Sequence, residues 1–369
     1  MRTLRTYRLG RVEYEDGLSL MRLAAEAVRA SAPPATDFLF LLEHPPIVTL
    51  GRSADRRNVL ASSDWLESQG LEVHEADRGG DVTYHGPGQV VGYPVVDLAD
   101  RPDVRRYVAA LEEAMICACA DHGLAAGRHP EHRGCWIEGR KIGAVGVHLS
   151  RWISSHGFAF NVRPEMGHFQ AIVPCGIAES GLGVTSLEAE LKALGRAAPP
   201  TSEVEDRLAA HLAEALGRRP SRGTVDLRTV SVVPVAPDGR VLLLRRVPER
   251  GGFWQPVTGR IEAGESSGAC AERELREETG FEGPVRSLEY QHGFALSPGV
   301  NGVREGTLVV AEEFAFAAPL AEMTAPRLSH EHCEHGWFAP EAAATLVPFV
   351  GLRKAVRLAA ALTARRVRP

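Results

Sequence analysis

Three carboxylates in the C-terminal part of the chain are spaced so that they could hold a metal ion together. They are Glu274, Glu277 and Glu278. Ser266 or Ser267 can begin a helix there and Gly280 can end it, and positions i, i+3 and i+4 of a helix share one face. Such a face is costly without a cation, and Mg²⁺ or Mn²⁺ would suit its oxygen ligands. The alternative is a solvated acidic face on which Arg273 is an ion-pair partner.

The wider spacing around these glutamates favours the metal site. The residues that fit it are Gly259, Glu265, Arg273, Glu274, Leu275, Glu277, Glu278, Gly280 and Phe281. They match every fixed position of the Nudix box, so this region resembles a Nudix hydrolase. The resemblance implies Mg²⁺ (or Mn²⁺)-dependent hydrolysis of a phosphoanhydride bond by a metal-activated water. It also implies that Glu274, Glu277 and Glu278 are metal ligands and that one of them serves as the base, a role for which we take Glu277.

The segments that flank the box narrow the resemblance. Residues 253–259, residues 298–300, and Glu331 with His332 and Trp337 resemble the dihydroneopterin triphosphate pyrophosphohydrolase branch. That resemblance implies a nucleoside or pterin triphosphate as substrate. It makes Glu331 a further metal ligand and places Arg246 and Thr258 against the substrate. Two alternatives stay open, namely a general nucleotide-cleaning hydrolase and a nucleotide sensor that regulates the rest of the chain.

A glycine-dense run, Arg78 to Gln89, precedes an apolar segment, Val90 to Leu98, that is typical of a strand. Glycines at this density allow positive φ and let the backbone approach a ligand closely. The alternative is a tight loop that only reverses the chain. The order of the residues in the run is more informative than the number of glycines.

The run is the centre of a series of motifs in the first 216 residues. The others are residues 43–46, 49–52, 139–143, 157–159 with Asn161, 173–177 and 185–187. In this order they resemble the octanoyltransferases. The resemblance implies a domain related to lipoate and biotin ligases that moves an octanoyl group from octanoyl-acyl carrier protein to a lysine. The acceptors would be the lipoyl domains of 2-oxoacid dehydrogenases and the glycine cleavage H protein.

Cys175 and Lys141 are the expected catalytic pair of this half. A cysteine exchanges one thioester for another with little energetic mismatch, which suits a covalent intermediate. A free thiol has a pKa of about 8.5, so a cation nearby is needed to populate the thiolate. Lys141 matches the lysine of the family motif. Alone, each residue would be interpreted as a packed thiol or a surface charge, but both lie inside matched motifs.

The resemblance also assigns substrate-binding segments. They comprise Arg78, Gly79, Gly80, Asp81, Val82, Thr83, Tyr84, His85, Ala144, Val145, Gly146, Gly157, Phe158 and Ala159. Their backbone amides could hold the thioester oxygen while their small side chains admit the acyl chain. His85 has an alternative role, which is to brace the loop through a hydrogen bond.

The transferase half is expected to need neither a metal nor a nucleotide. The rival function is an ATP-dependent lipoate ligase, which would need an adenylate site and no catalytic cysteine, so Cys175 argues against it. The remaining cysteines form no CxxC pair. We expect Cys117, Cys119 and Cys135 to be packing residues.

Length and composition predict two α/β domains. The chain has 369 residues, a net charge of −5 and 44% hydrophobic residues, which is long for one core and gives no support for nucleic-acid binding. Helical spacing over residues 202–216 is followed by the breaker-rich residues 217–223 and by a predicted hairpin at 229–244. We expect a lipoate/biotin ligase-like domain at 1–217, a linker at 218–225 and a Nudix α/β/α sandwich with a mixed sheet at 226–369.

The sequence also predicts where the protein works. The first residues lack the apolar core of a signal peptide, and no run of eighteen apolar residues occurs. We therefore expect a cytoplasmic protein that does not bind membranes.

Overall fold

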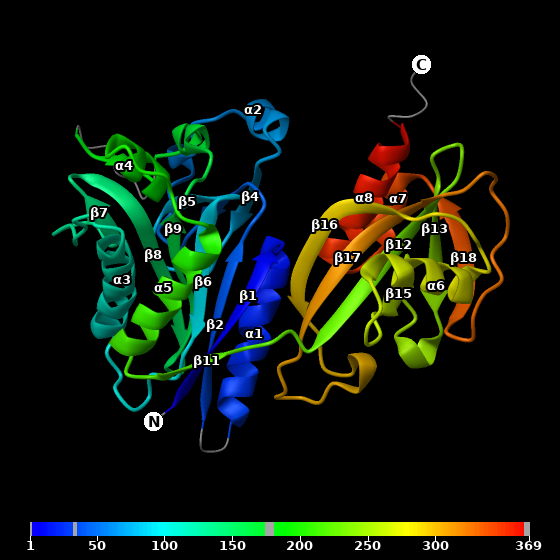
Figure 1. The fold of residues 1–369 in the computed structure, drawn as a ribbon, viewed down its shortest axis with the longest axis horizontal. Helices are drawn as coiled ribbons and strands as arrows, with labels where there is room; N and C mark the ends of the chain where they lie inside the picture. Colours follow the sequence, from blue (N-terminus) through cyan, green and yellow to red (C-terminus); the bar gives the residue numbers. More distant parts are fainter. Residues whose placement is uncertain (1, 32–34, 174–180, 365–369) are drawn as a thin grey trace. The chain divides into compact units, whose positions relative to one another are not determined.

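The computed structural model describes residues 2–31, 35–173 and 181–364. The chain forms two compact units whose main division lies between Thr224 and Val225, while residues 15–19 group with the second unit and residues 305–307 with the first. We call them the N-terminal unit and the C-terminal unit (Figure 1). Both contain helices and a mixed sheet, which confirms the predicted α/β fold class.

The N-terminal unit is built on an eight-stranded sheet within the described residues. Its order is β10-β8-β9-β6-β2-β1-β11, and β7 pairs with β8. The strands are β1 (Thr3–Arg11), β2 (Thr36–Glu43), β6 (Gln89–Val95), β7 (Cys135–Ile137), β8 (Arg140–Ser150), β9 (Ile153–Asn161), β10 (Gly183–Val184) and β11 (Arg219–Arg222). The glycine-dense run thus leads directly into β6, a central strand.

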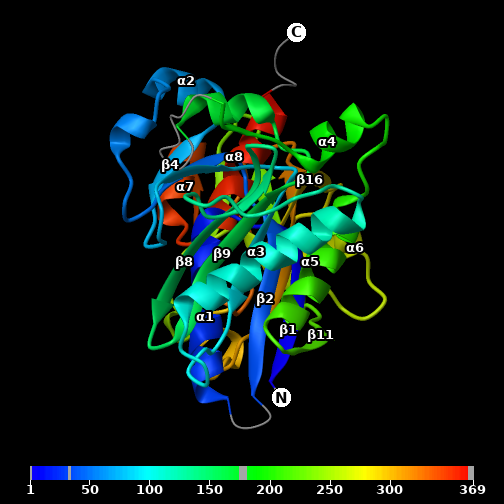
Figure 2. The ribbon, with the colours of Figure 1, turned by 90° about the vertical axis from the view of Figure 1, so that its left-hand side faces the viewer.

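Helices cover both faces of this sheet. Helices α3 (Val104–Asp121) and α5 (Thr201–Ala215) lie on one face (Figure 2) and share a core with β2, β8 and β9. Helix α1 (Tyr14–Ala30) lies on the opposite face. The short helices are α2 (Ser63–Ser68) and α4 (Leu187–Ala193), with 3-10 turns at Arg56–Asn58 and Met166–Ala171. A separate small sheet contains β3 (Ile47–Leu50), β4 (Glu72–Glu75) and β5 (Val82–His85).

Strand β11 lies inside the segment that we expected to be a linker. It pairs in parallel with β1, from Thr3 with Arg219 onward. The preceding residue, Arg218, donates from Nε to the buried carboxylate of Asp37 at 2.8 Å. The polar residues after α5 therefore form the edge strand of the N-terminal sheet.

The C-terminal unit has a seven-stranded sheet in its described part, with the order β14-β13-β12-β17-β16. Strand β15 pairs with β12, and β18 with β13. The strands are β12 (Leu227–Val235), β13 (Val241–Arg246), β14 (Trp254–Gln255), β15 (Val257–Arg260), β16 (Arg286–Ala295), β17 (Val310–Pro319) and β18 (His332–Phe338). The predicted hairpin corresponds to β12 and β13, which are antiparallel.

Alternate residues of β12 and β13 enter two different cores, because side chains of a strand alternate between its faces. Val230, Val232 and Leu242 pack with α6 (Ser267–Thr279). Val233 and Val241 pack with α7 (Pro340–Leu346) and α8 (Val350–Ala364) on the other side. Short 3-10 turns lie at Pro248–Arg250 and Val300–Gly302. The unit is therefore an α/β/α sandwich, as predicted.

Candidate functional site

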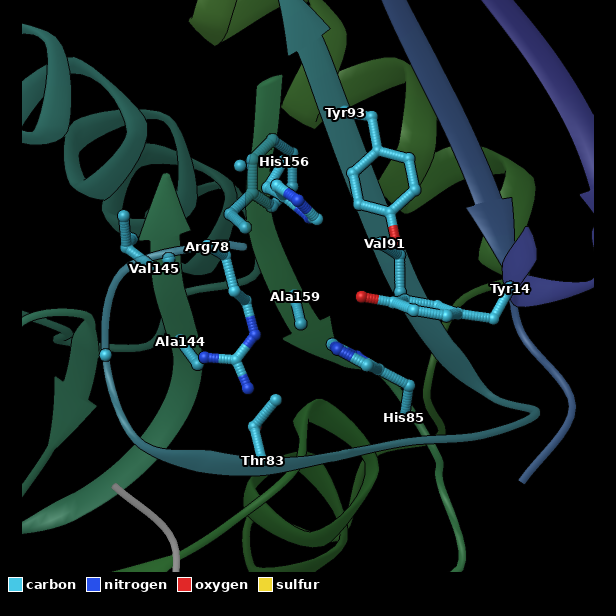
Figure 3. A pocket seen from close by; sticks show the side chains of 14 residues that line it. Tyr14, Arg78, Thr83, His85, Val91, Tyr93, Ala144, Val145, His156 and Ala159 are labelled. Atoms are coloured by element: carbon cyan, nitrogen blue, oxygen red, sulfur yellow. The ribbon is translucent and has the colours of Figure 1, made fainter. Parts of the chain in front are cut away.

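A pocket in the N-terminal unit gathers side chains from α1, the glycine-dense run, β6, β8 and β9 (Figure 3). Its lining consists of Tyr14, Arg78, Gly80, Thr83, His85, Val91, Tyr93, Ala144, Val145, Gly146, His156, Gly157, Phe158 and Ala159. Most of the segments predicted to bind substrate thus meet at one place. The predicted residues outside this lining are Gly79, Asp81, Val82 and Tyr84.

Small residues on two paired strands form the floor of the pocket. Ala144 of β8 lies opposite Ala159 of β9, and Gly146 lies opposite Gly157. The residues between them, Val145 and Phe158, also contact the hydrophobic core that includes α3. Because side chains alternate along a strand, the sheet presents small side chains to the pocket and larger ones to the core.

Arg78 crosses the pocket and is held by β3. It is 7% exposed, and its Nη2 donates to the carbonyl oxygen of Thr49 at 2.7 Å and to its hydroxyl at 2.8 Å. A Cβ on Gly146 would lie 3.2 Å from Arg78 Cδ, and one on Gly51 would overlap the Gly80 carbonyl. Glycine at these two positions therefore lets the run and the arginine approach the sheet closely.

The four predicted residues outside the lining support the run from behind. The Gly79 amide donates to the Val147 carbonyl at 2.9 Å. Asp81 accepts hydrogen bonds from the Asp55 amide at 3.1 Å and from Asn58 at 2.5 Å. Val82 and Tyr84 belong to the separate core beneath the small sheet. These four residues therefore hold the glycine-dense run in its conformation.

A chain of side-chain hydrogen bonds fixes the tautomer of His85. Asn161 donates to the Thr185 carbonyl at 2.9 Å, and Gln89 Nε2 donates to Asn161 Oδ1 at 2.9 Å and to the Tyr84 carbonyl at 3.2 Å. Gln89 Oε1 can then only accept, so His85 Nδ1 donates to it at 2.7 Å. Burial lowers the pKa of His85 to about 3. The ring is neutral at pH 7 and keeps Nε2 as an acceptor.

A second buried histidine lies next to His85, with its ring 5.9 Å away. His44 Nδ1 donates to the Val12 carbonyl at 2.7 Å, so Nε2 accepts from the Tyr93 hydroxyl, also at 2.7 Å. Burial lowers the pKa of His44 to about 4. The two histidine rings are thus neutral at pH 7 and fixed in direction.

A further histidine of the pocket, His156, contacts an aspartate that sequence reasoning did not find. Its Nε2 lies 2.6 Å from Asp77 Oδ1, and the residue is 3% exposed. Its φ of +56° is uncommon for a residue with a side chain. Burial lowers the pKa of His156 despite the aspartate.

Lys141 is buried on β8 beside an aromatic ring. It is 5% exposed, and its Nζ lies 4.9 Å from the centre of the Trp136 ring on the paired strand β7. The Trp136 indole N–H donates to the His132 carbonyl at 3.1 Å. Among the described residues, no carboxylate lies within ion-pairing distance of Nζ. The ammonium is therefore stabilised by a π face, which adds no negative charge.

The expected nucleophile, Cys175, lies outside the described residues. Of the other cysteines in the N-terminal unit, Cys119 and Cys135 are fully buried and belong to the core, while Cys117 is partly exposed. Burial and the neighbouring Glu113 raise the pKa of Cys117. Cys119 and Cys135 are core residues, as expected for packing.

The glutamates of the C-terminal unit surround Arg273. Helix α6 begins at the expected cap, since the Ser266 side chain accepts from the Ala269 amide at 3.2 Å, and it ends at Gly280 with a φ of +73°. Arg273 contacts Glu265 at 2.9 Å, Glu274 at 2.7 Å and Glu277 at 3.2 Å. Arg273 is thus the shared ion-pair partner of these carboxylates.

Glu278 and Glu274 extend from α6 toward β15. The Glu278 carboxylate is 6% exposed and accepts from the Thr258 amide at 3.4 Å. Burial, followed by the charge of Glu274, raises the pKa of Glu278 well above its usual value. Burial also raises the pKa of Glu274. A Cβ on Gly259 would overlap the Glu274 carboxyl carbon, which explains the glycine there.

The two remaining predicted residues, Glu331 and Arg246, contact each other. Arg246 Nη2 lies 2.9 Å from Glu331, which also pairs with Arg250 at 2.9 Å. Thr258 accepts a hydrogen bond from Gln255 at 2.9 Å. Within residues 2–31, 35–173 and 181–364, no three His, Cys, Asp or Glu side chains are arranged to hold a metal ion. Arg273 and Arg246 neutralise the carboxylates instead.

Sequence reasoning missed the pocket residues outside the motifs, notably Tyr14, Tyr93 and His156, and also Trp136. None lies in a glycine-rich or charged pattern that would single it out. Tyr14 is the first residue of a helix, and Trp136 lies in a strand of three residues. Their partners are far away in sequence, as in His156 with Asp77, so no local spacing reveals them.

Fold and site together define an α/β catalytic domain followed by a Nudix sandwich. Residues 13–213 match the family model of the lipoyl protein ligase A/B catalytic domain, and residues 226–357 match that of the NUDIX domain. An octanoyltransferase from Myxococcus xanthus is 48% identical over 98% of this chain and 100% of its own. The chain therefore belongs to the octanoyltransferase family, as an acyltransferase with a fused Nudix hydrolase domain.

A shorter relative and two solved structures cover single units. An octanoyltransferase from Solibacter usitatus is 47% identical over 58% of this chain and 93% of its own. Lipoate-protein ligase A bound with ATP matches 60% of this chain and 89% of its own, with 16% identity and a TM-score of 0.46. The E. coli dihydroneopterin triphosphate pyrophosphohydrolase matches 36% of this chain and 96% of its own, with 27% identity and a TM-score of 0.31.

None of the described helices is both long enough and apolar enough to cross a bilayer.

Proposed function

We propose that the N-terminal unit transfers an octanoyl group from octanoyl-acyl carrier protein to a lysine of a lipoyl domain, through a thioester on Cys175. The observation that carries the proposal is the pocket floored by Ala144, Gly146, Gly157 and Ala159. Lys141 lies on the same strand as this floor, three residues before Ala144, which is roughly 10 Å along a strand. The full-length relative named octanoyltransferase supports the assignment.

In the first half-reaction, the Cys175 thiolate attacks the carbonyl carbon of the carrier thioester. The carbon–sulfur bond to the carrier breaks, and the carrier leaves as a thiolate that takes up a proton. In the second, the lysine amine attacks the enzyme thioester, an amide forms, and the amine proton ends on the Cys175 sulfur. Both steps pass through a tetrahedral oxyanion, so donors near the carbonyl oxygen accelerate both.

The surroundings of Lys141 fit the role of a cation that stabilises a thiolate. A carboxylate partner would cancel much of the field that the thiolate experiences. The Trp136 ring at 4.9 Å stabilises the ammonium without adding negative charge. The positive field of Lys141 is therefore not offset by a described carboxylate. Such a field stabilises a nearby thiolate and so lowers the pKa of a neighbouring thiol.

Cys175→Ala separates this proposal from an ATP-dependent lipoate ligase. We expect the variant to lose octanoyl transfer to a purified lipoyl domain, and we expect the wild-type protein to transfer without ATP. Mass spectrometry should find an octanoyl adduct on the wild-type chain that is absent from the variant. Transfer that survives Cys175→Ala, or that requires ATP, would instead support the ligase.

For the C-terminal unit we propose Mg²⁺-dependent hydrolysis of a phosphoanhydride bond in a nucleoside or pterin triphosphate. The residues fit a hard divalent cation by their chemistry. Glu278 is buried, the neighbouring Glu274 is partly buried, and the pKa values of both carboxylates are raised. A bound cation would relieve their repulsion. The Gly259 backbone leaves room for Glu274. With Glu277 and Glu331, these two glutamates would hold the ion.

The bound ion would lower the pKa of a water molecule and neutralise charge on the phosphates. The protein would contribute orientation. Arg273 fixes Glu274 and Glu277, and the Thr258 amide holds Glu278. Arg246 and Arg250 lie at Glu331, where a triphosphate would find positive charge. We propose Glu277 as the base because its carboxylate is the more exposed, at 55% against 13% for Glu274.

Hydrolysis assays with and without Mg²⁺ test this proposal in the full chain. We expect Glu278→Gln to abolish nucleotide or pterin triphosphate hydrolysis and to leave octanoyl transfer unchanged. A chain that binds nucleotides but hydrolyses none would support the sensor. Hydrolysis of many unrelated nucleotides at similar rates would support a general cleaning role. Hydrolysis that survives chelation would refute the metal site.

A further inference from the structure

The pocket contains a buried hydroxyl that no side chain or backbone group of the described residues pairs with. Tyr14 is 5% exposed, and its hydroxyl has no hydrogen-bond partner among the described residues. Burying a hydroxyl without a partner is unfavourable. Burial raises the pKa of Tyr14 to about 12, so the group stays protonated at pH 7 and has a hydrogen to donate. Its position is therefore explained by a ligand that accepts a hydrogen bond.

The hydroxyl does not point into a packed core. Figure 3 shows it directed into the pocket, toward the space that the Arg78 guanidinium approaches from the other side. The ring of Tyr14 itself is held in place, with the His44 ring edge-on at 5.3 Å. The donor is thus fixed in direction before any ligand arrives, which is what stabilisation of a transition state requires.

A matching acceptor faces the same space. His85 donates from Nδ1 to Gln89, and the chain of hydrogen bonds behind Gln89 ends on the carbonyl oxygens of Tyr84 and Thr185. Carbonyl oxygens can only accept, so the direction of the whole chain is forced. His85 Nε2 therefore carries a lone pair, and the ring extends into the pocket beside Tyr14 (Figure 3).

We propose that the Tyr14 hydroxyl donates a hydrogen bond to the carbonyl oxygen of the reacting thioester, and that His85 Nε2 accepts one from the attacking lysine amine. The inference rests on the octanoyl transfer proposed above. Tyr14 is then a catalytic residue outside every motif of the sequence. His85 acquires a role beyond bracing the loop.

The pair matches the movement of electrons in amide formation. The amine nitrogen bonds to the carbonyl carbon, and the carbonyl π electrons move to oxygen, where the hydrogen bond from Tyr14 strengthens. The carbon–sulfur bond then breaks, its electrons go to sulfur, and the amine proton ends on that sulfur. His85 orients the amine and does not take its proton, because burial lowers the pKa of His85 to about 3.

Tyr14→Phe removes only the unused hydroxyl. We expect kcat for octanoyl transfer in the full chain to fall about 10²-fold with little change in KM, which is the usual loss for one oxyanion donor. The unfolding midpoint should stay the same or rise, because an unpaired buried hydroxyl is lost.

The matched control is Tyr107→Phe. Tyr107 is 2% exposed and donates to the Pro94 carbonyl at 3.3 Å, outside the pocket lining, so this variant should lose stability and keep kcat.

Single-turnover assays with octanoyl-acyl carrier protein and a purified lipoyl domain separate the two half-reactions. Tyr14→Phe should slow both the acylation of the enzyme and the transfer to the amine. His85→Asn should slow the amine step roughly tenfold more than acylation, the effect of one hydrogen bond. The ratio of the two rates within one variant is independent of how much protein is folded.

Three results would overturn the inference. A kcat for Tyr14→Phe within threefold of the wild type would remove the hydroxyl from the reaction. A rise in KM alone would make it a binding group. A loss of stability as large as that of Tyr107→Phe would make it structural. If instead Cys175→Ala still transfers octanoate, the proposed thioester fails, and the Tyr14→Phe result then applies to direct attack on the carrier thioester.

Discussion

Lowering the pH from 7.5 to 5.0 should destabilise the N-terminal unit through His44. In this pH range the His44 ring takes up a proton in the unfolded state but stays neutral in the folded state. Its Nδ1 donates to the Val12 carbonyl and its Nε2 accepts from the Tyr93 hydroxyl. A proton on Nε2 would displace the Tyr93 hydrogen and leave a charge in the core. This is why burial lowers the pKa of His44 to about 4.

The size of the effect follows from the two pKa values. The unfolded histidine titrates at about 6.5, so the stability is fully present above that pH and is lost as the pH falls toward 4. A pH of 5.0 lies about 1.5 units below the pKa of the unfolded histidine. Protonation therefore stabilises the unfolded state by about 2 kcal/mol there, and the folded state gains almost none of this free energy. For a unit of this size the unfolding midpoint should fall by roughly 4–8 °C.

The wild-type curve alone does not isolate His44. Burial raises the pKa of Glu205 to about 7, so this group binds a proton more readily in the folded state and stabilises it as the pH falls. His44→Gln keeps one donor and one acceptor but cannot be protonated. We expect thermal unfolding at the two pH values to show about 2 kcal/mol less acid destabilisation in the variant. An equal pH dependence in both proteins would refute the reasoning.

Other perturbations test single contacts. Trp136→Leu should lower the rate of octanoyl transfer about thirtyfold, since a desolvated cation–π contact contributes about 2 kcal/mol. Trp136→Phe should retain part of the rate. Trp152 is exposed, so the control variant Trp152→Leu should change the rate less than twofold. Gly259→Ala should lower nucleotide hydrolysis without changing transfer, because its Cβ displaces Glu274. Ala159→Leu should shift the preferred acyl donor toward chains about three carbons shorter, as measured by competition between donors; an unchanged preference would place the acyl chain elsewhere.

Local patterns in the sequence were sufficient for elements whose signals are local. Helix α6 is capped by Ser266 and by the left-handed Gly280, where the sequence predicts a start and a stop. Strand β11 was not predictable in this way. Its residues, from Arg219 to Arg222, are polar and include a proline, and they form a strand only because β1 offers an edge. Pairing between residues more than two hundred positions apart leaves no periodic signal.

The same distinction applies to the pocket. Motif order led to Arg78, His85 and the small residues of β8 and β9, which line it together. It could not lead to Tyr14, because a tyrosine at the start of a helix is ordinary. What distinguishes Tyr14 is a hydroxyl without a partner in the described part of the chain, a property that exists only once the surrounding strands are in place.

Buried polar atoms without partners have a common meaning in the two units. Besides the Tyr14 hydroxyl, they include Arg246 Nε and His332 Nε2 in the C-terminal unit, which are register partners across β13 and β18. Each such atom costs about 1–3 kcal/mol of folding stability. A ligand that supplies the missing partner recovers this free energy on binding or in the transition state. Variants such as Tyr14→Phe, in which stability and activity change in opposite directions, therefore separate a catalytic group from a structural one.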